Sequence, residues 1–280
     1  MTIQSPALPR SVKPRIALMG EFSAGKSTLA NLLLEQQHSP VQVTATQIPP
    51  VWYSYGNAPA HLVTLDGTRE PVHSKSWQEV SLRDAQLIEV QSQADILRAT
   101  DLIDLPGTCD PNLPAQYWET LITQVDLVIW CTPAHQAWRQ SEAALWETVP
   151  KELQNRSLLL ITRIDKILSQ RDRRRIVQRA RHEAGHAFAQ VTAASLTEAL
   201  AEPEDDAVME ESGAADIVRF LIQMFDEVGG TSRAPFMPNI LENDLAPHAQ
   251  DIVPERPAPN RIIPRRICRR SPQLTQRPTA

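Results

Sequence analysis

Eight residues near the N-terminus have a spacing suited to holding phosphate. The run from Gly20 to Ser27 reads GEFSAGKS, after a short apolar stretch and before leucines at helical spacing. Gly20 and Gly25 allow a tight bend and a close backbone approach to a ligand. Lys26 offers a charge to the β- and γ-phosphates, and Ser27 offers a hydroxyl to Mg²⁺. Strand, glycine-rich loop and helix N-terminus together predict a phosphate-binding loop rather than a chance Gly/Ser turn. The predicted nucleotide contacts here are Gly20, Phe22, Ser23, Ala24, Gly25, Lys26, Ser27 and Thr28.

The next candidate segment, residues 38–50, contains two threonines between prolines. The prolines exclude a helix and favour a loop across the mouth of the site. In a nucleotide switch such a loop supplies a threonine that completes the Mg²⁺ shell and positions water. Thr44 and Thr46 are both candidates, and a plain threonine-rich loop is the alternative.

An apolar strand near residue 100 ends in the sequence Asp104-Leu105-Pro106-Gly107. Asp104, at the strand end, can hold Mg²⁺ through water, and the Gly107 N–H can bind the γ-phosphate. This DxPG pattern is weak alone but strong downstream of a GKS loop.

A second apolar strand, residues 157–161, runs directly into Thr162-Arg163-Ile164-Asp165. A carboxylate at this place accepts two hydrogen bonds from guanine N1 and N2, whereas the edge of adenine has the wrong donors and acceptors. A mismatched base would leave a buried charge without its partners, so such a site discriminates strongly. Asp165 is therefore the candidate guanine selector, and a helix N-cap is its alternative.

Composition limits the classes of partner. The 280 residues carry a formal net charge of -5, which argues against nucleic acid as a partner. Three cysteines without metal-ligand spacing fit a reducing, cytoplasmic compartment. The longest apolar runs are too short for a transmembrane helix, and the proline-containing N-terminus does not resemble a signal peptide.

Strand-like and helix-like segments alternate along the chain, which predicts an α/β fold with a doubly wound, mainly parallel sheet and helices on both faces. Ligand is then expected at the carboxyl ends of the strands. A helix is expected after Ser76, and an amphipathic helix over 216–228 closes the domain. The predicted organisation is a flexible leader (1–12), a nucleotide-binding domain (13–228) with a flexible acidic insertion (about 201–213), and a disordered Pro/Arg-rich tail (229–280).

Two features of residues 169–188 allow more than one interpretation. The predicted helix contains six arginines, which could touch acidic lipid or nucleic acid, although a solvated outer helix is favoured. It also contains an HExxH match, from His182 to His186, a pattern that can bind Zn²⁺. We interpret this match as a coincidence, because the sequence offers no third ligand.

The phosphate loop and the order of motifs resemble those of the dynamin superfamily, especially bacterial dynamin-like proteins. The resemblance covers about residues 14–228 and rests on GEFSAGKS, a TxxP switch (Thr46 to Pro49), DLPG and TRID. It implies a P-loop GTPase domain that uses Mg²⁺. It further implies that Ser23 compensates transition-state charge, that Lys26 binds phosphate, and that Thr46 positions water and metal. The implied metal contacts are Ser27, Thr46 and, via water, Asp104; the implied base contacts are Thr162, Arg163 and Asp165, and Gly107 contacts phosphate.

Three departures from the family pattern are visible. Arg163 stands where a lysine is usual, the base-backing loop near Thr192–Ser195 is not recognisable, and the chain has no room for the helical stalk. Thr108, not glutamine, follows Gly107, which suits activation by dimerisation across the nucleotide face.

The leading hypothesis is a cytoplasmic GTPase that converts GTP to GDP and phosphate and is activated as a homodimer. The alternative is a nucleotide-binding adaptor with little turnover, whose basic tail docks on a protein partner or on anionic lipid at the inner face of the membrane. A third hypothesis is an ATP-using P-loop protein.

Overall fold

The computed structural model describes residues 13–35, 48–72, 80–82, 85–108 and 115–229. The chain divides into two units, residues 1–233 and 234–280, and all described residues belong to the first. The predicted leader, most of the threonine loop and the tail lie outside the described residues, so the predicted domain boundaries stay predictions. Within the described residues, no helix is both long and apolar enough to cross a membrane.

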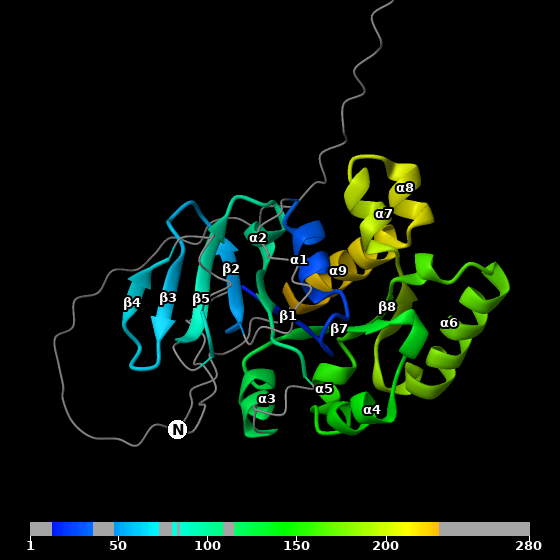
Figure 1. Ribbon diagram of the computed structural model, residues 1–280, viewed down its shortest axis with the longest axis horizontal. Coiled ribbons are helices and arrows are strands. Elements are labelled where there is room, and N and C mark those ends of the chain that lie inside the picture. Colours follow the sequence, from blue (N-terminus) through cyan, green and yellow to red (C-terminus); the bar gives the residue numbers. More distant parts are fainter. Residues whose placement is uncertain (1–12, 36–47, 73–79, 83–84, 109–114, 230–280) are drawn as a thin grey trace, which may run out of the picture. The chain divides into compact units, whose positions relative to one another are not determined.

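Five parallel strands form the part of the sheet that carries the site (Figure 1). Their spatial order is β6-β1-β7-β8-β9, and each is hydrogen-bonded to the next. Because all five run in the same direction, their carboxyl ends meet at one edge. Their bounds are β1 Arg15–Gly20, β6 Asp101–Asp104, β7 Leu127–Pro133, β8 Leu158–Thr162 and β9 Gln190–Ala193.

The remaining four strands extend the sheet beyond β6 in the order β4-β3-β5-β2. Strand β2 is antiparallel to β6 and parallel to β5, and β3 is antiparallel to both β4 and β5. The nine-stranded sheet is thus mainly parallel, as predicted, with antiparallel pairs in this extension. The bounds are β2 Val51–Tyr55, β3 His61–Thr64, β4 Arg69–Pro71 and β5 Ala85–Ser92.

Strand β5 corrects the expectation of a helix after Ser76. Residues 73–79 lie outside the described part of the chain, but residues 85–92 form a strand paired on both sides. Leu87 packs into one core and its neighbour Ile88 into the other, as alternating strand residues do. Burial on both faces hides the simple alternation by which a half-exposed strand is recognised.

Helices cover both faces of the sheet, as the sequence predicts. Successive residues of β1 alternate between two cores, with Ile16 and Leu18 in one and Ala17 and Met19 in the other. The first core includes residues of α1 (Lys26–Leu33), α2 (Ile96–Ala99), α7 (Leu196–Ala201) and α9 (Ala214–Gly229). The second includes residues of α3 (Ala115–Ile122), α4 (Gln140–Trp146), α5 (Lys151–Gln154) and α6 (Gln170–Ala184).

The predicted acidic insertion contains regular structure, which corrects the expectation of a flexible segment. Helix α8 spans Asp206–Glu211, and the Asp205 side chain caps it by accepting from Ala207 N at 2.8 Å. Arg219 of α9 forms an ion pair with Glu210. The helix was missed because its acidic residues lower its apparent hydrophobicity, whereas its cap and a basic partner stabilise it.

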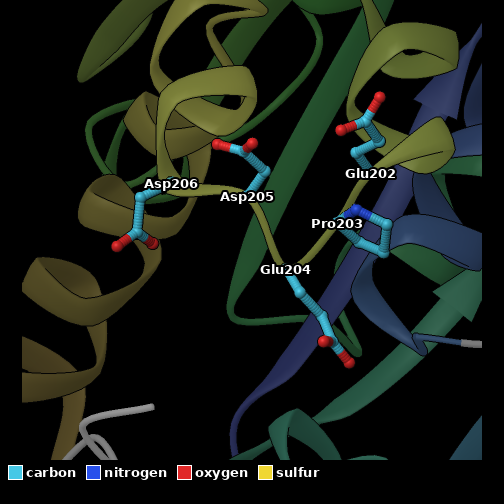
Figure 2. A pocket seen from close by; sticks show the side chains of 5 residues that line it. All are labelled: Glu202, Pro203, Glu204, Asp205 and Asp206. Atoms are coloured by element: carbon cyan, nitrogen blue, oxygen red, sulfur yellow. The ribbon is translucent and has the colours of Figure 1, made fainter. Parts of the chain in front are cut away.

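The acidic residues before and within α8 line an open pocket but do not converge. Figure 2 shows the carboxylates of Glu202, Glu204, Asp205 and Asp206 pointing in different directions around Pro203. Among the described residues, no group of three or more His, Cys, Asp or Glu side chains could hold a metal ion.

Candidate functional site

The predicted phosphate loop lies between the end of β1 and the start of α1. Gly20 has a φ of 136°, and a Cβ there would lie 2.1 Å from the Cys131 carbonyl oxygen on the adjacent β7. Gly25 is the N-cap of α1 with a φ of 96°. Both positions therefore require glycine. The first turn of α1 has no acidic residue. Its N-terminus therefore presents backbone N–H groups and the positive end of the helix dipole to the loop.

Lys26 and Ser27 begin α1 and face the two neighbouring strand ends. The buried Lys26 ammonium donates to the carbonyl oxygens of Gly20 and Glu21, at 3.0 and 2.9 Å. The Ser27 hydroxyl donates to the Asp104 carboxylate at 2.7 Å. Ser27 and Asp104, which are 77 positions apart in the chain, are thus adjacent, as the motifs predict. A hydroxyl beside a carboxylate is an all-oxygen donor set, which fits Mg²⁺.

The DLPG segment packs directly against the phosphate loop. Thr108 N donates to the Gly20 carbonyl at 3.1 Å, and a Cβ on Gly107 would lie 2.9 Å from Phe22 N. Gly107 therefore allows the two loops to touch, and its predicted phosphate contact stays a prediction. Phe22 itself is 45 % exposed and Ser23 is also exposed.

The TRID segment reaches the phosphate loop through two side chains. The buried Thr162 hydroxyl, at the end of β8, donates to Ala24 O at 2.7 Å. The Arg163 guanidinium donates to Ser23 Oγ at 3.4 Å. Thr162 thus braces the phosphate loop, a contribution that the sequence did not suggest. Arg163 has a φ of 56°, a strained value for a residue that is not glycine.

Asp165 lies in the short 3-10 turn Ile164–Lys166 that follows β8. Its side chain is only 12 % exposed and pairs with the Lys166 ammonium at 3.2 Å. The turn position places it just beyond the strand end, where the sequence predicts the guanine selector. Asp165 does not take its alternative role as the N-cap of the next helix. The N-cap of α6 is Ser169, whose side chain accepts from Asp172 N.

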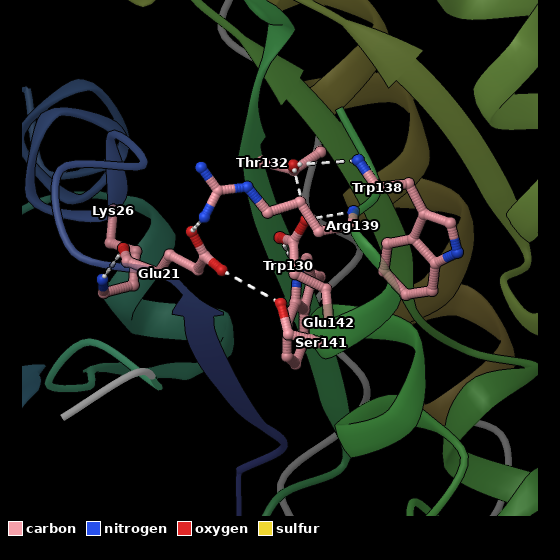
Figure 3. Close-up of polar contacts among 8 residues, drawn as sticks. All are labelled: Glu21, Lys26, Trp130, Thr132, Trp138, Arg139, Ser141 and Glu142. Atoms are coloured by element: carbon pink, nitrogen blue, oxygen red, sulfur yellow. Dashed lines mark hydrogen bonds and ion pairs between the residues drawn. The ribbon is translucent and has the colours of Figure 1, made fainter. Parts of the chain in front are cut away.

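An ion pair near the phosphate loop was missed in the sequence. Arg139 Nη1 lies 2.9 Å from Glu21 Oε2, across 118 residues, and Ser141 Oγ donates to the same carboxylate at 3.4 Å (Figure 3). Arg139 precedes α4, and its backbone N donates to Glu142 Oε2 at 2.8 Å. The pattern Arg-x-x-Glu is not a recognised cap sequence, so it gave no signal.

Buried groups around this ion pair have shifted pKa values. Burial raises the pKa of Glu142, against the opposing effect of hydrogen bonds from Trp130, Arg139 N and Thr132. Burial also raises the pKa of the Cys131 thiol to about 12, although Lys26 opposes the shift. Cys131 is therefore a fully buried core residue.

The arginine-rich helix α6 is more than a solvated face. Arg173 donates to the carbonyls of Ile167 and Asp165, at 2.6 and 3.4 Å. Arg179 donates to Ala137 O at 2.7 Å, and Arg181 donates to Val191 O. Arg173 and Arg179 thus hold loops at the carboxyl edge of the sheet, and Arg181 holds strand β9. The HExxH match is broken, because α6 ends at Ala184 and His186 lies in the 3-10 turn Gly185–Ala187.

Not all of the predicted site residues lie within the described part of the chain. Thr44 and Thr46 lie outside the described residues, so the choice of switch threonine stays a prediction. In the base-backing segment, Ser195 is buried at 1 % exposure, and its hydroxyl makes no hydrogen bond within the described part of the chain. Thr28 is half-buried in the first turn of α1.

Comparisons with known proteins agree with this geometry. The chain is 33% identical over 110 residues to the isoniazid-induced protein IniC of Mycobacterium tuberculosis, covering 35% of this chain and 22% of IniC. It is 26% identical over 220 residues to dynamin-like protein 2 of Campylobacter jejuni, covering 75% of this chain and 34% of the relative. The chain thus spans no more than about a third of these relatives.

Solved structures show the same fold. A structure of an oligomerised bacterial dynamin pair superposes with a TM-score of 0.62 at 18% identity, covering 76% of this chain and 45% of that one. A second structure of such a pair gives a TM-score of 0.56 at 17% identity, covering 77% and 36%. The dynamin family model matches residues 16–164, from β1 to the turn that carries Asp165. This match spans more than half of the chain and includes the phosphate loop, DLPG and most of TRID, so the chain belongs to the dynamin family.

Proposed function

We propose that this protein binds GTP and hydrolyses it to GDP and phosphate. The observation that carries the proposal is the meeting of two distant segments, DLPG and TRID, at the phosphate loop. Ser27 contacts Asp104, Gly107 contacts Phe22, and Thr162 contacts Ala24. Membership of the dynamin family supports the same activity.

The residues have distinct proposed roles. Lys26 and the N–H groups of residues 22–27 bind phosphate oxygens and stabilise the negative charge that develops during transfer. Ser23 and Thr46 position the attacking water. Its oxygen bonds to the γ-phosphorus while the bond to the β–γ bridging oxygen breaks, which leaves GDP as the product. Ser27, Thr46 and, through water, Asp104 would hold Mg²⁺, which neutralises phosphate charge when bound.

The proposed base contacts give specificity for guanine. Asp165 accepts from guanine N1 and N2, while Arg163 covers the base with its aliphatic stem. The 12 % exposure of the Asp165 side chain supports this assignment, because a carboxylate that is shielded from water discriminates between bases more strongly than a solvated one. A mant-GTP titration beside mant-ATP tests the assignment. We expect tight guanine binding that Asp165→Ala weakens, whereas equal affinity for both nucleotides would support the ATP-using alternative.

The substitution Lys26→Ala tests the proposed role of Lys26 in GTP hydrolysis. We expect it to reduce hydrolysis at least about 100-fold, as loss of a preorganised charge commonly does. Arg174→Ala, which removes an exposed positive charge of α6 outside the site, is the matched control and should change the rate only slightly. An unchanged rate in Lys26→Ala would contradict the assignment.

We further propose that hydrolysis is stimulated by homodimerisation across the nucleotide face. The bacterial dynamin structures are described as those of an oligomerised pair, which supports association between such proteins. Single-turnover rates should rise with protein concentration.

A hydrolysis rate that stays near zero at every protein concentration would favour the adaptor hypothesis, in which the late-tail arginines dock the protein on a partner or an anionic membrane. Flotation with anionic vesicles tests that peripheral membrane contact.

A further inference from the structure

Glu21 is an acidic residue inside a loop that is proposed to bind an anion. Its backbone carbonyl accepts from Lys26, the proposed phosphate-binding lysine, at 2.9 Å. Its side chain is 11 % exposed, so solvent screens the carboxylate only in part. A negative charge held here would oppose the binding of a polyphosphate.

Arg139 provides the compensating charge. Its guanidinium lies 2.9 Å from the Glu21 carboxylate, although the two residues are far apart in the chain. Figure 3 shows Arg139 reaching across to Glu21 from the segment between β7 and α4, with Lys26 on the other side of Glu21. Arg139 therefore contacts the phosphate loop through Glu21.

The segment that carries Arg139 is fixed by several contacts. Glu142 accepts from Arg139 N, from Trp130 Nε1 at 2.9 Å and from Thr132 Oγ1 at 3.1 Å. The Trp138 ring packs edge-on against Trp130, with ring centroids 6.1 Å apart. The Arg139 side chain is 42 % exposed, but these contacts fix the backbone from which it reaches the mostly buried Glu21 carboxylate, unlike an ion pair between two mobile side chains, which usually contributes little.

The same segment is also held by α6 and by Phe188, which follows the 3-10 turn after α6. Arg179 donates to Ala137 O at 2.7 Å, and Trp138 packs against Phe188 with centroids 5.2 Å apart. The guanidinium of Arg139 is thereby presented to Glu21 from a rigid support. Preorganised charges act more strongly than charges that must first be ordered.

We propose that Arg139 is a positioning residue that neutralises Glu21 and so allows the phosphate loop to accept a nucleoside triphosphate. The inference rests on the proposed function and adds a residue to it. Because a triphosphate carries more negative charge than a diphosphate, loss of Arg139 should weaken triphosphate binding more. The effect should also shrink as salt concentration rises, because ions screen the charge of Glu21.

The test compares four variants of the full chain: Arg139→Ala, Arg139→Lys, Glu21→Gln and the double variant Arg139→Ala/Glu21→Gln. Affinities for mant-GDP and mant-GMPPNP are measured by fluorescence at several salt concentrations. Mant-ATP is titrated in parallel, so that the effect of the Glu21 charge can still be measured if the protein binds ATP rather than GTP. Arg174→Ala, which removes an exposed arginine of α6, is the control for loss of one positive charge.

Arg139→Ala should weaken mant-GMPPNP binding about tenfold and mant-GDP binding less, a size typical of coupling between contacting charges. Glu21→Gln should bind at least as tightly as the wild type. The double variant should recover to within about twofold of wild type, and Arg139→Lys should recover in part. A purely structural role for Arg139 would predict no such recovery and no difference between triphosphate and diphosphate.

Two results would overturn the inference while leaving GTP binding intact. One is an Arg139→Ala variant that binds both nucleotides like the wild type. The other is a double variant as weak as Arg139→Ala. A wild-type protein that binds none of the three nucleotides would instead overturn the proposed function and this inference together.

Discussion

At Gly20 two constraints act on a single residue. Its φ of 136° is strained for any other amino acid, and an added Cβ would lie 2.1 Å from backbone of β7. We expect Gly20→Ala to lower the free energy of unfolding by about 3 kcal/mol, since strain and overpacking each cost roughly 1–3 kcal/mol. Urea unfolding measures this change, and nucleotide binding should be lost with it.

Gly67 provides the matched control for that substitution. It also has a positive φ, 85°, but a Cβ there meets nothing within 4 Å. Gly67→Ala should therefore cost only the backbone strain, about 1 kcal/mol. Equal costs at the two positions would show that the contact with Cys131 is unimportant.

Glu142 gives a prediction about pH. Burial raises the pKa of its carboxyl, so the folded chain holds this proton more tightly than the unfolded chain does. Its contribution to stability is therefore full at low pH and is lost as pH rises through the folded-state pKa. Glu142→Gln cannot titrate, so its free energy of unfolding should fall less than that of the wild type as pH rises from about 4 to 7. Parallel curves for the two proteins would contradict the raised pKa.

Helix α6 shows how an element can act on the site without touching a ligand. Arg173 donates to the Asp165 carbonyl, in the turn after β8, and to the Ile167 carbonyl just beyond that turn. We expect Arg173→Ala to weaken mant-GTP binding about tenfold, in line with the loss of charged hydrogen bonds. Arg174→Ala, the next residue along and exposed, should leave binding unchanged. A similar loss in both variants would point to general electrostatics instead of a clamp on the turn.

Elements that are marked by motif spacing or hydrophobic periodicity could be predicted from the sequence. Elements that depend on contacts between distant residues could not. The strand 15–19, the DLPG and TRID strand ends and the helix after GKS follow from spacing and periodicity, and the structure confirms them. Strand β5 was missed because both its faces are buried, and α8 was missed because its acidic residues are balanced by Arg219. Arg139 could not be foreseen either, since its contact with Glu21 depends on the order of strands in space.

At the scale of the whole molecule, strand order is what assembles the site. The phosphate loop, Asp104 and Thr162 leave the carboxyl ends of β1, β6 and β8, and Arg139 follows the end of β7. These four strands are adjacent and parallel, so residues up to 140 positions apart meet at one edge. The alternation of strands and helices in the sequence predicted the parallel sheet, whereas the extension β4-β3-β5-β2, with its antiparallel pairs, has no counterpart in that pattern.

The two cores give the last prediction. Within the described residues, their members run from Ile16 to Met224, and α9 ends at Gly229. Removing residues 234–280 therefore deletes no member of either core. We expect a chain of residues 1–233 to bind mant-GTP like the full chain and to melt within about 4 °C of it, a shift that corresponds to roughly 1 kcal/mol at this size. A larger fall in melting temperature would mean that the last 47 residues, from 234 to 280, contribute to folding. If binding and melting are unchanged but vesicle flotation is lost, that part of the chain serves membrane attachment and not nucleotide binding, as the adaptor alternative proposes.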